Sequence, residues 1–134
     1  MSEENKELVR KYIDLSWNKG KFGLLHQLAG KHFRYQTTFR DGFRNFDEYV
    51  DYVSDMRYSV PDLEVIIEDI MAEQNKVITF SSFCGSFKNP LFGLPANGKI
   101  ITFTGASVWT IHRNKIIEQT TMVDLHGLQK QLIA

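Results

Sequence analysis

The sequence has only one cysteine, Cys84, and its 134 residues carry no formal net charge. A lone cysteine cannot form a disulfide within the chain, which fits a reducing compartment. Sixteen basic residues balance sixteen acidic ones. The lysines and arginines are spread along the chain, whereas nucleic-acid binders usually carry a clustered basic surplus. We therefore expect no nucleic-acid partner.

Long hydrophobic runs are also missing. No stretch approaches the roughly 20 apolar residues of a membrane span, and the charged residues 1–6 are followed by no apolar signal-peptide run. These features predict a cytoplasmic protein with no membrane partner. The four histidines are scattered without metal-ligand spacing, so we expect neither a metal nor another cofactor.

Aromatic residues, by contrast, are abundant, with ten phenylalanines, five tyrosines and two tryptophans. So many rings can build a core or form the wall of a cavity. The length is typical of one domain with its own hydrophobic core, and no linker or repeat divides the chain. We expect a single domain over residues 1–134.

Hydrophobic periodicity places helices before strands. Helical spacing predicts a first helix that ends at Gly20 and a second, short helix that ends at Gly30. It predicts a third helix that begins at the capping box of Asn45 and Glu48 and ends before Pro61. Alternation predicts strands at 32–39, which ends at an Asp41-Gly42 turn, and at 63–67, 77–83, 100–111 and 116–123. Residues 125–132 are read as a short helix or tail. This order is typical of an α+β fold.

Two glycines lie inside the strand patterns, Gly85 and Gly105. Glycine inside a strand often marks a bulge or a sharp bend. Long strands that bend enclose a concave space, and the N-terminal helices are available to fill it. We expect a curved antiparallel sheet around a largely apolar pocket.

Five segments in this order resemble the SnoaL-like polyketide cyclases, a branch of the nuclear transport factor 2-like superfamily. They are WNKG at 17–20, PDL at 61–63, GLPANGK at 93–99, KIIE at 115–118 and DLHGLQKQL at 124–132. The resemblance implies a cone-shaped α+β barrel with the N-terminal helices packed into a strongly curved antiparallel sheet. It also implies a deep pocket and a homodimer through the outer sheet face.

The resemblance also implies which positions would hold the catalytic residues. It places the catalytic aspartate of the cyclases at Thr121 and histidines of their site at Gln119, Ser107 and Tyr35. A threonine hydroxyl does not act as a general base near pH 7. General acid–base catalysis typically contributes about a hundredfold to ten-thousandfold in rate. The sequence therefore predicts altered or absent acid–base chemistry.

The register between strands 100–111 and 116–123 decides which side chains share the pocket. A loop with an odd number of residues, Arg113 to Lys115, places Gln119 and Thr121 on the same face as Ser107. A two-residue turn instead places Glu118 and Thr120 there, because a one-residue slip turns every side chain over. The family comparison favours the odd loop.

With that register, the predicted ligand-binding groups are uncharged and surrounded by aromatic rings. They are Tyr35, Ser107, Gln119 and Thr121, with Trp17, Phe83, Phe92 and Trp109 in the wall. Such a site suits a small, largely apolar molecule.

Two other functions stay open. An active cyclase, isomerase or dehydratase could use Asp124 or Tyr35 in place of the usual aspartate, although Asp124 is also placed to cap the helix at 125–132. Alternatively, the domain could be a non-catalytic interaction module that forms a homodimer through Thr102, Thr104, Ala106, Val108 and Thr110 on the outward strand face.

Overall fold

The computed structural model describes residues 2–38 and 40–134, and it confirms the α+β class. The helical elements are α1 (Ser2–Ile13), the π-helix η1 (Asp14–Asn18), α2 (Phe22–Leu25), the 3-10 helix η2 (His26–Leu28), α3 (Phe46–Ser59) and α4 (Leu125–Leu132). The strands are β1 (Ala29–Thr37), β2 (Arg40–Arg44), β3 (Glu64–Glu73), β4 (Lys76–Ser86), β5 (Ile100–His112) and β6 (Lys115–Val123). Part of the strand expected at 32–39 is β1, and Phe39 lies outside the described residues. Sequence patterning missed β2, which contains the expected Asp41-Gly42 turn.

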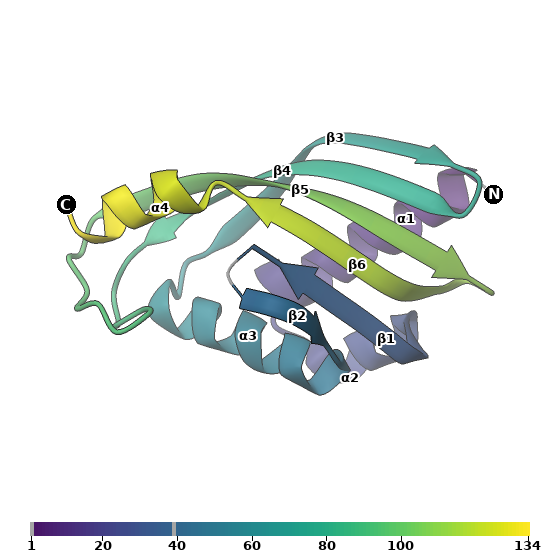
Figure 1. The fold of residues 1–134 in the computed structure, drawn as a ribbon, viewed down its shortest axis with the longest axis horizontal. Coiled ribbons are helices and arrows are strands. Elements are labelled where there is room, and N and C mark those ends of the chain that lie inside the picture. The colour runs from purple at the N-terminus through teal and green to yellow at the C-terminus, as the bar shows by residue number, and fades with distance from the viewer. Residues whose placement is uncertain (1, 39) are drawn as a thin grey trace.

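The described strands form one six-stranded sheet in the order β2-β1-β6-β5-β4-β3. It is open, with β2 and β3 at its edges (Figure 1), so it does not close into the expected barrel. Strands β1 and β6 run parallel, whereas the other neighbouring pairs are antiparallel. The sheet is therefore mixed, and the expectation of a wholly antiparallel sheet is wrong in this one pair.

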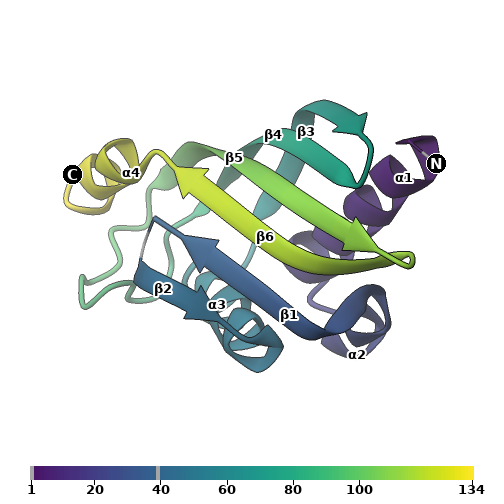
Figure 2. The same cartoon turned by 45° about the vertical axis from the view of Figure 1, so that its right-hand side comes forward.

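Helices α1 and α3 cover one face of the sheet, and α4 follows β6 and lies beside the start of β5 (Figures 1 and 2). The apolar face of α1 buries Val9 and Tyr12, and that of α3 buries Tyr49 and Val53. The ring of Tyr12 lies 5.6 Å from that of Tyr49 and 5.6 Å from that of Trp109 on β5. Aromatic side chains from helices and sheet thus fill the space that the curved sheet encloses.

The capping box predicted at the start of α3 is confirmed. The Asn45 side chain accepts a hydrogen bond from the Glu48 backbone N–H, and the Glu48 side chain accepts one from the Asn45 N–H, at 2.9 and 3.0 Å. The helix ends at Ser59, before Pro61. Local sequence signals therefore set both ends of the helix that covers β1.

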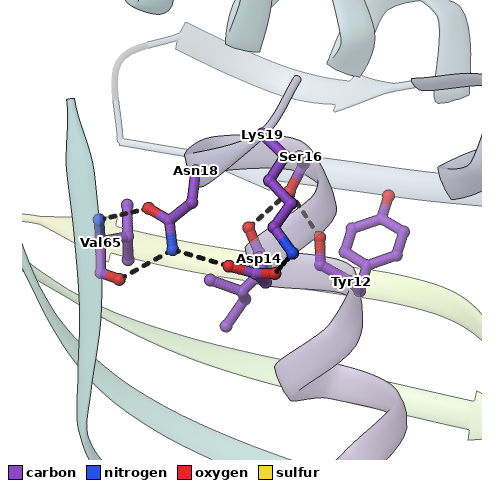
Figure 3. Close-up of polar contacts among 7 residues, drawn as sticks. Tyr12, Asp14, Ser16, Asn18, Lys19 and Val65 are labelled. Atoms are coloured by element: carbon purple, nitrogen blue, oxygen red, sulfur yellow. Dashed lines mark hydrogen bonds and ion pairs between the residues drawn. The ribbon is translucent and has the colours of Figure 1, made fainter. Parts of the chain in front are cut away.

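The π-helix η1 joins α1 to the edge of the sheet through Asn18 (Figure 3). The Asn18 amide accepts a hydrogen bond from Val65 N at 2.7 Å and donates to Val65 O at 3.2 Å. It also donates to the Asp14 carboxylate at 3.2 Å, which forms an ion pair with Lys19 at 2.9 Å. The Asn18 side chain thus pairs with β3 as a neighbouring strand would, and this fixes the position of the adjacent Trp17.

The two strand glycines mark neither a bulge nor a change of register, contrary to expectation. Pairing between β4 and β5 is continuous through Gly85 and Gly105. At Gly85, a β-carbon would lie 2.3 Å from Cγ1 of Val60, so the glycine allows the end of α3 to approach the sheet closely. Gly85 therefore serves close packing between α3 and the sheet.

The β5–β6 connection is a two-residue turn, and the expected three-residue loop is wrong. Arg113 and Asn114 both have positive φ, 49° and 60°, as the tight hairpin turn favoured by strand twist requires. His112 pairs with Lys115 and Ile111 with Ile116, but Thr110 pairs with Glu118. Ile117 is therefore the extra residue of a β-bulge.

The bulge restores the pairing that the odd loop was expected to produce. Beyond it, Trp109 pairs with Gln119 and Ser107 with Thr121. Ile116, immediately before the bulge, is the fully buried isoleucine at the start of β6. The predicted partners of Ser107 are thus confirmed, although the physical cause is different.

Across residues 2–38 and 40–134, no helix is long and apolar enough to cross a membrane.

Candidate functional site

A buried polar cluster lies where β5 and β6 pair. The Ser107 and Thr121 hydroxyl oxygens are 2.8 Å apart, and the Gln119 amide donates to the Thr121 oxygen at 2.8 Å. All three side chains are buried. The structure therefore brings together three of the four predicted polar binding residues by direct hydrogen bonds.

The cluster leaves one acceptor unused. The side-chain oxygen of Gln119 is buried and has no hydrogen-bond partner among the described residues. A buried polar atom without a partner typically costs about 1–3 kcal/mol. Such an atom is a candidate acceptor for a bound molecule or an ordered water.

Aromatic rings surround the cluster, as the sequence predicts for most of them. The Trp17 ring packs edge-on against Phe83, with centroids 5.4 Å apart, and Phe83 stacks on Phe103 at 4.6 Å. The Trp109 indole N–H donates to Thr79 at 2.9 Å. Trp109 is therefore fixed as a wall residue, and its one polar atom is already bonded.

The cavity between these walls is small, at about 20 Å³. It is lined by Ile13, Trp17, Tyr35, Tyr52, Val65, Thr79, Ser81, Phe83, Phe103, Gly105, Ser107, Trp109, Gln119, Thr121 and Val123. A cavity of this volume holds about one water molecule. The structure does not show the deep pocket that the resemblance implies, because side chains fill most of the interior.

A larger, open cleft adjoins the cavity on the side of α3. Its volume is about 410 Å³, and Tyr35 and Tyr52 line both spaces. Phe92 lies in this outer cleft with 51% of its surface exposed, not in the inner wall where it was predicted. The loop that carries Phe92 lies outside the sheet, so strand alternation could not place it.

Sequence reasoning missed several cavity residues, including Tyr52, Thr79 and Ser81. Thr79 and Ser81 follow the same alternation that turns Phe83 inward on β4, so that signal was available. Tyr52 lies three residues after Tyr49 on α3, but helical spacing alone does not tell a core residue from a cavity residue.

No carboxylic acid lines the cavity within the described part of the chain. Asp124 is exposed, and its carboxylate caps α4 by accepting the Gly127 N–H at 3.0 Å. Glu118 forms an ion pair with Arg34 at 2.9 Å. The expected helix-capping role of Asp124 is confirmed, and its carboxylate lies outside the cavity lining.

The tyrosines at the cavity are neutral near pH 7. Burial raises the pKa of Tyr35 to about 12 and raises that of Tyr52 above its usual value. Their hydroxyls are therefore hydrogen-bond donors rather than bases. Among residues 2–38 and 40–134, no three His, Cys, Asp or Glu side chains are grouped to hold a metal.

Comparisons with known proteins agree with this fold. The model of the SnoaL-like polyketide cyclase family matches residues 6–132, and no curated protein matches the chain. AclR from Streptomyces galilaeus has a TM-score of 0.88 at 16% identity, with 98% of this chain and 97% of AclR covered. A protein from Jannaschia sp. CCS1 assigned to the SnoaL-like polyketide cyclases has a TM-score of 0.90 at 19% identity, with 99% and 94% covered.

TsrD from Streptomyces laurentii is a further structural neighbour. Its TM-score is 0.84 at 20% identity, with 97% of this chain and 95% of TsrD covered. These TM-scores show a shared fold, and the family match covers nearly the whole chain. The chain therefore belongs to the SnoaL-like polyketide cyclase family.

Proposed function

We propose that this member of the SnoaL-like polyketide cyclase family binds the uncharged, largely apolar body of a small molecule at the Gln119–Thr121 cluster. We further propose that it does so without acid–base chemistry of the kind that the family resemblance assigns to an aspartate. The observation that carries the proposal is the unpaired, buried oxygen of Gln119 beside two hydroxyls in an aromatic wall.

The chemistry of the lining supports a neutral ligand. A ligand hydroxyl or N–H can donate to the Gln119 oxygen, and the rings of Trp17 and Trp109 offer apolar surface to its body. A charged ligand would lose its hydration here without gaining an opposite charge. The part of the ligand that lies in this cavity should therefore be uncharged, with one or two polar groups.

Binding requires side chains to move, because the cavity holds only about one water. Tyr35 and Tyr52 lie between this cavity and the outer cleft. A shift of these two rings would join the spaces and admit a ligand from outside. Side-chain changes of this kind are common on binding.

A thermal-shift and NMR screen with uncharged polycyclic and aromatic alcohols and ketones tests the proposal. Hits should stabilise the wild type and perturb the Gln119 side-chain amide signals. Gln119→Met, which keeps the size but removes the acceptor, should weaken binding by about tenfold. The control Thr120→Val, a substitution outside the cavity, should bind as the wild type does. A screen without hits, or an unchanged affinity in Gln119→Met, argues against the proposal.

We also propose that the outer sheet face joins two copies of this chain. On that face Ile78 pairs across strands with Val108, and Ala106 lies between Phe80 and Met122. The large apolar side chains among them, Ile78, Phe80, Val108 and Met122, are all exposed. A contiguous apolar patch of this kind is typical of a protein–protein interface.

A further inference from the structure

We infer that the outer cleft across α3 is a subsite for an organic ammonium group carried by an aromatic ligand. The inference rests on the proposed function, because the cleft meets the inner cavity at Tyr35 and Tyr52. It adds a charged part to a ligand whose body is apolar.

Three carboxylates line this cleft from one face of α3. Glu48, Asp51 and Asp55 follow the spacing of three and four residues that aligns side chains on a helix. Within the described part of the chain, the side-chain carboxylates of Asp51 and Asp55 form no hydrogen bond or ion pair. Their charges are therefore available to a ligand.

Among the side chains that the structure describes, Arg44 is the one cation that lines the cleft, and of the three carboxylates it forms an ion pair only with Glu48. Arg44 donates to the backbone oxygens of Asp41 and Phe43, at 2.8 and 3.2 Å. Its Nε lies 3.9 Å from Glu48, which is the limit of an ion pair. Three negative side chains and one positive side chain line the described part of the cleft, so this lining is acidic.

An unpaired polar atom lies in the floor of the cleft. Thr37 is only 9% exposed, and its hydroxyl oxygen forms no hydrogen bond of normal geometry among residues 2–38 and 40–134, although it lies close enough to the Tyr35 and Tyr52 hydroxyls to offset slightly the rise in pKa that burial causes in both. A buried hydroxyl without a partner is costly. An ammonium N–H of a ligand can donate to this oxygen, so the floor and the acidic wall favour the same ligand group.

Exposed aromatic rings complete the cleft. It continues into a second hollow of about 240 Å³, and the two share Tyr52, Asp55 and Phe92. Tyr58, which is 65% exposed, lines this second hollow. Aromatic faces beside carboxylates attract organic cations. Within the described residues the three carboxylates are not grouped closely enough to hold a metal ion, which favours a larger, spread cation.

Binding of naphthylethylamine, compared with its uncharged analogue naphthylethanol, tests the inference on the full chain at pH 7. NMR titration should show the amine binding about fivefold more tightly than the alcohol. The variant Asp51→Asn/Asp55→Asn should lose this preference while its affinity for naphthylethanol stays the same. Its charge-matched control is Glu68→Gln/Asp69→Asn on β3, outside the cleft, which should keep the preference.

Equal affinities for the two probes in the wild type, or a preference that survives in Asp51→Asn/Asp55→Asn, overturn the inference. In either case the inner-site proposal stands, because it depends on Gln119. Binding of neither probe also overturns the inference, and the Gln119→Met screen then decides the inner site separately.

Discussion

Ser107 and Thr121 lie on neighbouring strands with their hydroxyl oxygens 2.8 Å apart, deep between the sheet and the helices. Thr121 also accepts the Gln119 amide at 2.8 Å. At the position where the family resemblance places an acid, this chain has a hydroxyl that is already engaged in two hydrogen bonds. The position has thus become part of a neutral network.

Replacing Thr121 with valine should destabilise the fold by about 1–3 kcal/mol, because Ser107 and Gln119 each lose a buried partner. Urea unfolding measures the loss. The same change at Thr120, on the other face of β6, should stay within about 0.5 kcal/mol of the wild type. Equal effects at the two positions would show that the cluster contributes little.

Stability should fall in strong alkali. Burial raises the pKa of Tyr35 from about 10 to about 12, so the folded state favours the neutral ring. This contribution is fully present below pH 10 and is lost as the pH rises toward 12. Urea unfolding between pH 8 and 12 should show the decline, which Tyr35→Phe should reduce. Tyr58→Phe, at an exposed position, should leave the decline unchanged.

Removing the Asn18 side chain should loosen the edge strand β3. Asn18→Ala removes both hydrogen bonds to the Val65 backbone, and we expect a loss of about 1–2 kcal/mol. Amide hydrogen exchange at Val65 should accelerate. Asn89→Ala serves as the control, since the Asn89 amide donates to Tyr58 O at 2.8 Å, away from β3. Unchanged exchange at Val65 would contradict the anchoring role.

Substitutions at Asp124 separate capping from catalysis. Asn is as good an N-cap as Asp, so Asp124→Asn should keep both stability and any turnover, whereas Asp124→Ala should lose about 1 kcal/mol. Thermal unfolding and assays of candidate cyclic substrates provide the two measurements. Turnover in the wild type that is abolished by Asp124→Asn would revive the displaced-base hypothesis.

The proposed homodimer predicts a concentration-dependent mass in light scattering. Val108→Glu places a charge at the centre of the exposed apolar face and should give a monomer at micromolar concentration. Lys130→Glu, on exposed α4, should not change the mass. A wild type that is already monomeric at this concentration would refute the interface.

Local chemistry in the sequence determined much of this protein. Alternation alone predicts that Ser107 and Trp109 lie on one face of β5, and the Asn45–Glu48 capping box predicts where α3 begins. The structure agrees with both. These features were predictable because each depends on residues only a few positions apart. Given the family resemblance, the sequence alone also shows that threonine stands at position 121 in place of an aspartate.

Other features were decided by contacts between distant segments. A two-residue turn by itself predicts a β5–β6 register in which Thr120 lies beside Ser107. The bulge at Ile117 shifts this register and brings Thr121 beside Ser107. The parallel pairing of β1 with β6 likewise depends on which strands meet, not on either strand's own pattern. Phe92 lies in a loop, where strand alternation predicts nothing, and the structure places it in the outer cleft.

The volume of the cavity was also decided by contacts between distant segments. The sequence shows that aromatic residues are abundant, but their side chains leave about 20 Å³ beside Gln119 only because helices and sheet pack to a particular separation. Residue type and spacing therefore determined the uncharged character of the site. Its size and its position next to an acidic cleft were decided by tertiary packing, since both depend on how far apart elements from opposite ends of the chain come to rest.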